Sequence, residues 1–236
     1  MPIKRPLYAH VHAGMVERIR SGRWKPGQLI PNEFEIAREF GVSQGTARKA
    51  IGALAEERLV VRQQGRGTFV YQHTPDDIQF RFFNVFDETG ERIMPVSRST
   101  KCLPGKANRA ERKALRLATN ARVIRVSRIR AHGRRRLITE TVVLPEAVFP
   151  GLADLPEIPD TFYDVFQKDY GVLVTHTEER VTATPANAAC AEDLGIAAGT
   201  ALVRIERTAF TMDGRPVEWR VSLCHFKGAY YLARTR

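Results

Sequence analysis

Cysteine is scarce in this chain of 236 residues, and long hydrophobic runs are absent. The three cysteines, Cys102, Cys190 and Cys224, stand far apart, without a Cys-x-x-Cys pair or a Cys/His group at metal-ligand spacing. No stretch holds about 18 uncharged apolar residues, and the N-terminus lacks an apolar segment followed by a small-residue cleavage site. We therefore expect a soluble, cytoplasmic protein with no metal site and no membrane partner.

Sequence motifs of catalysis are missing as well. The chain has no Ser/His/Asp set, no phosphate-binding glycine loop and no cluster of potential metal ligands. No catalytic residue and no cofactor is therefore predicted. The pattern disfavours an enzyme, although an enzyme that needs no nucleophile stays open.

Positive charge is in excess: 37 Lys and Arg stand against 26 Asp and Glu, which gives a net charge of +11. Residues 1–73 hold 12 Lys and Arg and 6 Asp and Glu, a net charge of +6, which leaves +5 for the longer remainder. A basic excess favours polyanionic partners. Nucleic acid is the leading candidate, and the N-terminal region is the more densely basic part.

The sequence pattern changes at residues 71–80, YQHTPDDIQF. Helical periodicity and one hairpin precede this segment. After it, ARVIRVSRIRAHG and TALVRIERTAFTM alternate like strands and end at the hairpin signals Gly133-Arg134 and Asp213-Gly214, with helical segments near residues 106–118, 161–170 and 186–194. We predict an α+β protein with a DNA-binding domain at residues 1–72, a linker at 73–79 and a largely antiparallel sheet domain at 80–236.

Three helices are predicted in the N-terminal domain. The first, in LYAHVHAGMVERIRSG, ends near Gly22 and has an apolar face made of Leu7, Val11, Met15, Val16 and Ile19. The second begins after the N-cap Asn32, has Glu35 at the reciprocal capping position and ends at Gly41. The third begins after the N-cap Ser43 and has an inward face made of Ala47, Ala50, Ile51 and Leu54.

The second and third helices with their short turn predict a helix-turn-helix, whose third helix enters the major groove by its N-terminal end. Arg48 can donate two parallel hydrogen bonds to a guanine edge. Ser43 and Thr46 can bind phosphates through their hydroxyls and the free helix N–H groups, and Arg38 and Lys49 are also placed for phosphates, which position the protein without reading sequence. The predicted DNA contacts of this motif are Arg38, Ser43, Gln44, Thr46, Arg48 and Lys49.

A second DNA-binding element follows in LVVRQQGRGTFV, which alternates between apolar and polar residues around Gly65-Arg66-Gly67. The two glycines allow a tight turn and close approach of the backbone to a surface, and Arg66 supplies a charge that fits a narrow minor groove. We interpret this hairpin as a wing. Either motif alone is weak, but their adjacency at winged-helix spacing favours DNA binding over a solvated turn.

These residues resemble the winged helix of the GntR family over about residues 7–70. The matching segments are Lys25-Pro26-Gly27, Pro31-x-Glu33, Phe40-Gly41-Val42-Ser43, Thr46-x-Arg48 and Gln64-Gly65-x-Gly67-Thr68-Phe69-Val70. Two departures stand out. Asn32 replaces a more usual Ser and keeps the helix cap. Gln44-Gly45 replaces a pair that usually contains Arg, a residue that makes one of the family's operator contacts.

Charged residues interrupt the strands of the C-terminal domain. Arg128 and Arg130 are two positions apart on a strand, so both point to one face, where two guanidinium groups can converge on a carboxylate or phosphate. The alternative is a solvated basic face, because the neighbourhood is rich in arginine. Glu140 and Glu218 stand in the apolar strands LITETVVL and PVEWRVSL, where an acid must be paired or on the wet face.

The segments MPVSRSTK, VSRIRAHG, ITETVVLPEAVFPGL, DTFYDVFQKDYG and GRPVEWRVSLC resemble, in order and spacing, the UTRA effector domain of the HutC subfamily, over about residues 79–234. The resemblance implies a chorismate-lyase-like fold and ligand-gated dimerisation. It implies an effector pocket that uses the Arg-x-Arg strand, the two acids, and residues matching a Ser-x-Tyr pair and an anion-holding pair. The implied effector contacts are Ser97, Arg98, Arg128, Arg130, Glu140, Thr161, Tyr163, Glu218 and Cys224, the last of which stands where the family often has Tyr.

The leading hypothesis is a ligand-responsive transcription regulator, expected to be a repressor that binds a palindromic operator on double-stranded DNA as a homodimer. Its effector is expected to be a small anion, such as a sugar phosphate or a urocanate-like carboxylate. One alternative is a lyase-like enzyme of chorismate-lyase fold tethered to DNA. Another is an architectural DNA binder without an effector, which would leave the large second domain without a role.

Overall fold

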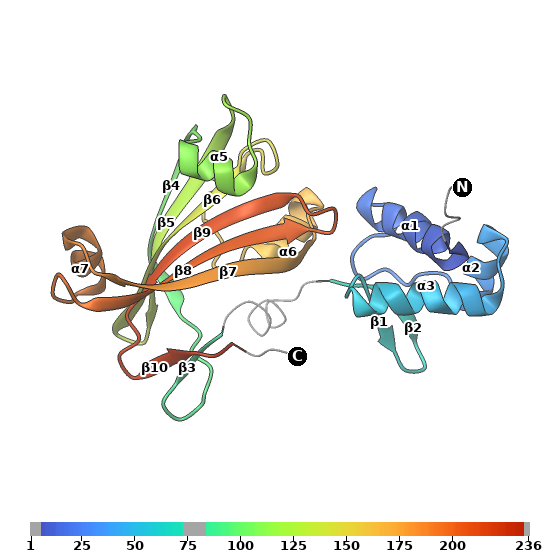
Figure 1. Ribbon diagram of the computed structural model, residues 1–236, viewed down its shortest axis with the longest axis horizontal. Coiled ribbons are helices and arrows are strands. Elements are labelled where there is room, and N and C mark those ends of the chain that lie inside the picture. Colours follow the sequence, from blue (N-terminus) through green and yellow to red (C-terminus); the bar gives the residue numbers. More distant parts are fainter. Residues whose placement is uncertain (1–5, 73–83, 234–236) are drawn as a thin grey trace. The chain divides into compact units, whose positions relative to one another are not determined.

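The computed structural model describes residues 6–72 and 84–233, which divide into two compact units (Figure 1). The first contains three helices, a hairpin and the short segment 167–171, and the second contains the other described strands with the remaining segments that connect them. The predicted linker at residues 73–79 and the boundary at residue 80 lie outside the described residues. In the described part of the chain, no helix is long and apolar enough to cross a membrane.

The first unit is a winged helix. Its elements are α1 (Leu7–Arg20), α2 (Glu33–Phe40), α3 (Gln44–Glu56), β1 (Val60–Gln63) and β2 (Gly67–Val70). β1 and β2 pair antiparallel, and an isolated bridge between Leu29 and Phe69 adds a third short segment to the hairpin. This is the predicted arrangement of three helices and a wing.

The predicted caps set the helix boundaries. Oδ1 of Asn32 accepts hydrogen bonds from the backbone N of Phe34 and of Glu35 at 3.0 Å, and Glu35 accepts one from the Asn32 N at 2.8 Å, which completes the capping box. Gly41 ends α2 in the left-handed conformation, and Oγ of Ser43 accepts a hydrogen bond from the Thr46 N at 3.2 Å. These local contacts confirm the predicted helix-turn-helix boundaries.

The core of the first unit lies between α1 and α3. Val11 and Met15 of α1 are fully buried, together with the predicted inward face of α3, namely Ala47, Ala50, Ile51 and Leu54. Leu7, which was predicted on the same apolar face, is the first residue of α1, and its side chain is 66% exposed.

The second unit is built on a six-stranded antiparallel sheet in the order β4-β5-β6-β9-β8-β7. Its strands are β4 (Val96–Lys106), β5 (Arg122–His132), β6 (Arg135–Pro145), β7 (Val174–Pro185), β8 (Ala201–Thr211) and β9 (Pro216–Cys224). A two-stranded ribbon of β3 (Val85–Asp87) and β10 (Ala229–Tyr231) stands apart from this sheet. The predicted hairpin turns at Gly133 and Gly214 are confirmed, and both glycines have positive φ.

Helices occupy the three predicted segments: α5 (Arg109–Leu115), α6 (Tyr163–Tyr170) and α7 (Ala188–Leu194). Leu115, the last residue of α5, packs with Trp219 of β9, and α7 packs with Leu223 of the same strand. Side chains on a strand alternate between its faces, so both helices cover the face that carries these odd-numbered residues of β9. The opposite face carries Glu218, Arg220, Ser222 and Cys224, and this face holds the polar site described below.

Candidate DNA interface and effector site

The start of α3 presents the predicted base-reading residue already oriented. Arg48, whose side chain is 63% exposed, donates a hydrogen bond from Nε to Oε2 of Glu33 at 2.8 Å. Nε2 of Gln44 donates to the same oxygen at 3.5 Å. Glu33 is the first residue of α2, so the two helices of the motif are linked through the side chains that would face a base edge.

The other predicted DNA contacts of the motif have different surroundings. The hydroxyls of Ser43 and Thr46 lie 2.9 Å apart at the N-terminus of α3. Nζ of Lys49 lies 4.2 Å from the ring centroid of Tyr8, so this ammonium group is directed toward α1. Arg38 is exposed on α2. The structure therefore brings Ser43, Gln44, Thr46 and Arg48 together at the start of α3, while Lys49 is directed toward α1 and Arg38 is exposed on α2.

The wing has the predicted glycine-dependent turn. Gln63 pairs with Gly67, the Arg66 N donates to the Gln63 carbonyl at 3.0 Å, and Gly65 and Gly67 have φ angles of +72° and +115°. Cζ of Arg66 lies 5.9 Å from the ring centroid of Phe69, and Arg66 itself is exposed. The tip of the hairpin thus presents one cation beside backbone that lacks side chains.

The two wing glycines are expected to differ in their tolerance of alanine. A Cβ on Gly67 would lie 2.6 Å from Cδ1 of Leu29, whereas a Cβ on Gly65 would meet no atom within 4 Å. Both positions have positive φ, so we expect Gly65→Ala to lower the free energy of unfolding by about 1 kcal/mol and Gly67→Ala by about 2 kcal/mol or more. Thermal unfolding of both variants measures this, and equal losses would show that Leu29 moves aside without cost.

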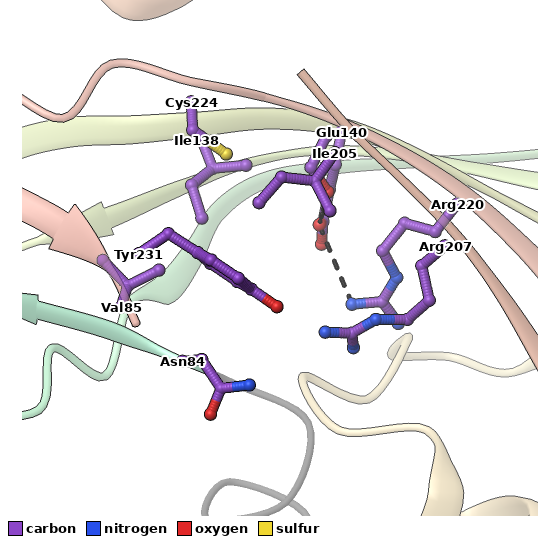
Figure 2. Close-up of a pocket in the computed structure, with 10 residues that line it drawn as sticks. Asn84, Val85, Ile138, Glu140, Ile205, Arg207, Arg220, Cys224 and Tyr231 are labelled. Carbon is purple, nitrogen blue, oxygen red and sulfur yellow. Dashed lines mark hydrogen bonds and ion pairs between the residues drawn. The ribbon is translucent and has the colours of Figure 1, made fainter. Parts of the chain in front are cut away.

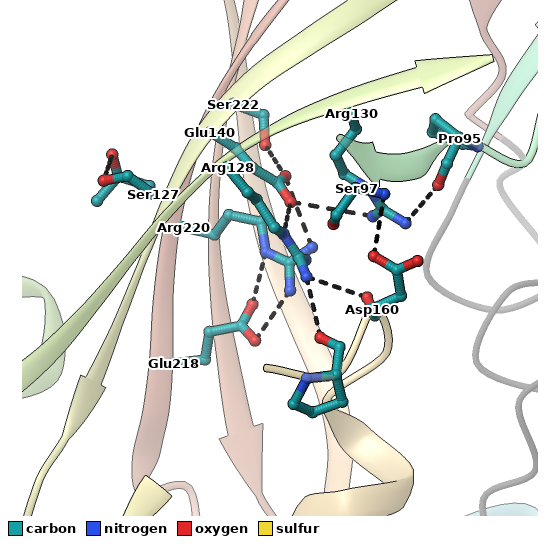
Figure 3. A network of polar contacts seen from close by, with 12 residues as sticks. Pro95, Ser97, Ser127, Arg128, Arg130, Glu140, Asp160, Glu218, Arg220 and Ser222 are labelled. Carbon is teal, nitrogen blue, oxygen red and sulfur yellow. Dashed lines mark hydrogen bonds and ion pairs between the residues drawn. The ribbon is translucent and has the colours of Figure 1, made fainter. Parts of the chain in front are cut away.

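In the second unit, Arg128 and Arg130 do point to one face, and that face is buried. Their exposed fractions are 3% and 7%, and Glu140, at 4%, lies opposite Arg128 on the neighbouring strand β6. Nε of Arg128 donates to Oε1 of Glu140 at 2.6 Å, and its Nη1 reaches the carbonyl of Asp160 at 3.1 Å (Figure 3). The alternative of a solvated basic face is therefore wrong for these two arginines.

Glu140 is the centre of a larger network (Figure 3). Its Oε2 accepts a hydrogen bond from Oγ of Ser222 at 2.9 Å and lies 3.8 Å from Nη1 of Arg220. Nη1 of Arg130 lies 3.9 Å from Oε1 of Glu140, and Nη2 of Arg130 donates to the carbonyl of Pro95 at 2.7 Å. One carboxylate thus faces three guanidinium groups that come from β5 and β9.

Glu218 is the second buried acid, and it is fully enclosed. Arg220, two residues further along β9, donates to both of its carboxylate oxygens at 3.0 and 3.1 Å. The hydroxyl of Tyr163 donates to Oε1 of Glu218 at 3.3 Å. Both predicted acids are therefore paired inside the protein, which is one of the two arrangements that their apolar strands allowed.

Four buried arginines meet three acids in the network. Within the described residues, Arg128, Arg130, Arg207 and Arg220 are at most 9% exposed and face two fully or nearly buried acids and Glu179, whose side chain is 16% exposed. Burial tends to raise the pKa of Glu140, but the surrounding arginines outweigh burial and hold this pKa well below its ordinary value. Burial lowers the pKa of Arg130 to about 10, against the opposing effect of Glu140.

A cavity of about 30 Å³ opens beside this network (Figure 2). The sheet contributes Arg207, Arg220 and Cys224 to its walls, and the β3–β10 side contributes Asn84 and Tyr231. Burial raises the pKa of the Cys224 thiol, the neighbouring Glu140 adds to this effect, and the side chain is 1% exposed. Cys224 therefore lines the cavity as an uncharged, weakly polar wall.

Three predicted effector contacts lie at the edge of the network or outside it. The N of Ser97 donates to Oδ1 of Asp160 at 3.1 Å, while Nη2 of Arg98 donates to the carbonyl of Gly133 at 2.9 Å. Both line an open groove along β4. The Thr161 hydroxyl donates to Asp164 at 3.0 Å at the start of α6, so it serves the helix terminus. Of the Thr161 and Tyr163 pair, the structure brings only Tyr163 into the network.

Several members of the network were missed in the sequence. Arg220 and Ser222 follow Glu218 at two-residue steps, so the argument used for Arg128 and Arg130 would have found them. Arg207, Glu179 and Tyr231 come together from β8, β7 and β10. In the winged helix, the contact between Glu33 of α2 and Arg48 of α3 was also missed. No local pattern signals these contacts, because their partners are distant in sequence.

A winged helix joined to a sheet domain with a buried, arginine-rich site defines a DNA-binding regulator with a ligand-binding domain. Residues 7–70 match the bacterial regulatory proteins of the gntR family, and residues 93–227 match the UTRA domain. The chain therefore belongs to the transcriptional regulators of the GntR family that carry a UTRA domain.

Known proteins are similar in sequence or in fold to most of the chain or to parts of it. The HTH-type transcriptional regulator YurK of Bacillus subtilis is 29% identical over 223 residues, which span 93% of this chain and 91% of that protein. The histidine utilization repressor of Pseudomonas aeruginosa is 38% identical over 87 residues, 37% of this chain and 35% of the relative. The ligand-binding domain of a GntR-family regulator from Bordetella bronchiseptica has a similar fold, with a TM-score of 0.61 and 24% identity over 66% of this chain and 98% of that one.

The matched families consist of regulatory proteins and not of enzymes. The alternative of a lyase-like enzyme tethered to DNA is therefore set aside.

Proposed function

We propose that the protein binds a palindromic operator as a homodimer and leaves it when a small anionic metabolite enters the UTRA domain. The observation that carries this proposal is the cluster of four buried guanidinium groups around Glu140 and Glu218. Guanidinium groups donate strong, charge-assisted hydrogen bonds to carboxylates and phosphates, so such a cluster suits an anionic ligand.

The proposed DNA contacts follow from the surroundings of each side chain. Arg48 is the base-reading residue, because it is exposed and Glu33 already holds its guanidinium group at the start of α3. Gln44 shares this position. We assign phosphate contacts to Ser43, Thr46, Arg38 and Lys49, and contacts along the minor groove to the wing, Gly65, Arg66 and Gly67.

Two such units related by a two-fold axis would read half-sites about one helical turn apart. In this proposal residues 1–72 bind DNA, residues 73–79 connect, and residues 80–236 bind the effector and dimerise. The effector can act only if it prefers one arrangement of the dimer, because a ligand shifts an equilibrium by its difference in affinity for the two states. The site of action is the cytoplasm, where a bacterial regulator meets DNA.

The proposed effector contacts fall into two groups. Arg128, Arg130, Glu140, Tyr163, Glu218 and Cys224 belong to the buried network or its cavity, and Ser97 and Arg98 line the neighbouring groove. Thr161 would contact the effector only if its hydroxyl left Asp164. Sugar phosphates and urocanate-like carboxylates both carry the required negative charge.

An anisotropy titration of the full chain on DNA from its own upstream region, at a stated salt concentration, tests the proposal. We expect specific binding, and release by one member of a panel of sugar phosphates and carboxylates at micromolar concentration. Specific binding that no anion reverses would contradict the sensing role. Weak binding that is indifferent to sequence would contradict the operator role.

A further inference from the structure

Two side chains at the start of α3 share one carboxylate oxygen of α2. Oε2 of Glu33 accepts a hydrogen bond from Nε of Arg48 at 2.8 Å and another from Nε2 of Gln44 at 3.5 Å. Glu33 directly follows the N-cap Asn32, where the capping box fixes the backbone, and its side chain is 25% exposed against 63% for Arg48. The helix-turn-helix therefore holds the acceptor in place, and the acceptor holds the arginine.

The contact with Nε limits how Arg48 can bind DNA. A guanidinium group donates hydrogen bonds from Nε and from both of its Nη groups. Because Nε of Arg48 donates to Glu33, the two Nη groups are the donors left for the DNA. Two parallel donors match O6 and N7 of guanine, but they also match two oxygens of a phosphate. The shape of the donor pair by itself does not decide between base and backbone.

The negative charge of Glu33 distinguishes these two targets. Its carboxylate lies 2.8 Å from Nε of Arg48, so any group that Arg48 binds also comes close to this charge. A phosphate carries a full negative charge, which the carboxylate repels, whereas O6 and N7 of guanine are uncharged acceptors. The carboxylate also offsets the positive charge with which Arg48 attracts the backbone. The ion pair therefore weakens phosphate binding more than guanine binding.

We propose that Glu33 determines the sequence specificity of Arg48, because it directs the two Nη groups to guanine and disfavours their binding to the phosphate backbone. Arg48 touches the base, and Glu33 is a positioning residue that acts through Arg48. This inference rests on the proposed operator binding and adds the reason why Arg48 reads sequence instead of binding all DNA alike. Loss of the Glu33 charge should improve binding to unrelated DNA, which loss of a purely structural contact would not do.

Glu35 provides a matched control for the charge of Glu33. Both acids lie in the first turn of α2, where a negative charge is favourable at the positive end of the helix dipole. Glu35 is exposed and accepts a hydrogen bond from the Asn32 N at 2.8 Å. Glutamine closes a capping box as well as glutamate does. Glu35→Gln therefore removes one charge from the same turn, keeps the cap and leaves the ion pair of Arg48 intact.

Anisotropy titrations of Glu33→Gln test the proposal on three DNAs: the upstream fragment, the same fragment with 7-deazaguanine in place of guanine, and a scrambled fragment. 7-Deazaguanine lacks the N7 acceptor, so the affinity lost on this replacement measures guanine reading. Glu33→Gln should bind the scrambled DNA about two- to fivefold more tightly, which is what one exposed ion pair contributes. Its salt dependence there should steepen by about one phosphate contact. The 7-deazaguanine replacement should cost it less affinity than it costs the unmodified protein.

The control variants should respond differently. Glu35→Gln should change the affinity for all three DNAs by the same factor and keep the full loss on 7-deazaguanine. In the Arg48→Ala background, Glu33→Gln should also change all three affinities by the same factor, because Glu33 acts through Arg48. Equal responses of Glu33→Gln and Glu35→Gln, or a full loss on 7-deazaguanine in Glu33→Gln, would overturn the proposal.

The unmodified protein and Arg48→Ala separate this inference from the proposed function. Discrimination that is lost in Arg48→Ala but complete in Glu33→Gln would overturn the role of Glu33 and leave operator binding intact. Equal binding of the unmodified protein to upstream and scrambled DNA would contradict both. The predicted response of Glu33→Gln, with no anion able to release the DNA, would support the role of Glu33 and contradict only the proposed effector response.

Discussion

Glu140→Gln is expected to lower the free energy of unfolding of the UTRA domain by about 3–5 kcal/mol, since removal of one partner from a buried ion pair leaves uncompensated charge. Glu140 is fully buried and faces Arg128 at 2.6 Å, with Arg220 and Arg130 at 3.8 and 3.9 Å. Glutamine has nearly the same shape, so the loss reports charge and not a cavity. Denaturant unfolding of the full chain measures it.

Glu146→Gln is the control for this substitution. Glu146 also pairs with an arginine, Arg122, at 2.7 Å, but the side chains are 35% and 54% exposed. Exposed ion pairs contribute about 0–1 kcal/mol. A difference of less than 1 kcal/mol between the two variants would contradict the picture of Glu140 as the neutralising centre of the network.

The pH dependence of stability should have the same origin. The pKa of Glu140 is held below its ordinary value of 4.5 in the folded protein, so its contribution is fully present above pH 4.5 and is lost as the pH falls through the lowered value. The unmodified protein should therefore lose stability relative to Glu140→Gln when both are titrated with acid. An unchanged difference between the two proteins down to the acid transition would argue against this assignment.

The second large effect is expected at the DNA interface. Arg48→Ala should reduce discrimination between the operator and unrelated DNA by about 1–3 kcal/mol, which is what a bidentate contact to guanine contributes. Arg48 is exposed and oriented by Glu33, so little of the loss should come from folding. Anisotropy titrations on operator and scrambled DNA at one salt concentration measure it.

Arg66→Ala is the matched comparison, since Arg66 is also an exposed arginine of the winged helix. It should weaken binding to both DNAs more evenly, because a charge in the minor groove acts chiefly through shape and electrostatics. Intact discrimination by Arg48→Ala would remove this residue from base reading. Unchanged affinity of Arg66→Ala would show that the wing stays off the DNA.

The sequence predicted helix ends and strand faces correctly where the contacts that define them are local. Asn32, Ser43 and Gly41 define the ends of α2 and α3 through hydrogen bonds that span two to four residues. Arg128 and Arg130 share a face because alternate residues of any strand do. Leu7 shows the limit of this reasoning, because periodicity placed it on the apolar face of α1 but did not specify whether another element covers it.

The sequence by itself therefore determined the winged helix, its caps, the hairpins of the sheet domain and the face of the two central arginines. Only the tertiary structure decided which charged side chains meet in the buried network around Glu140. Glu140 and Ser222 are 82 residues apart and become partners because β6 and β9 are neighbours in the sheet. Tyr231 reaches Glu179 from a strand outside that sheet. Which strands pair depends on their order in the folded sheet, and local propensity does not specify that order.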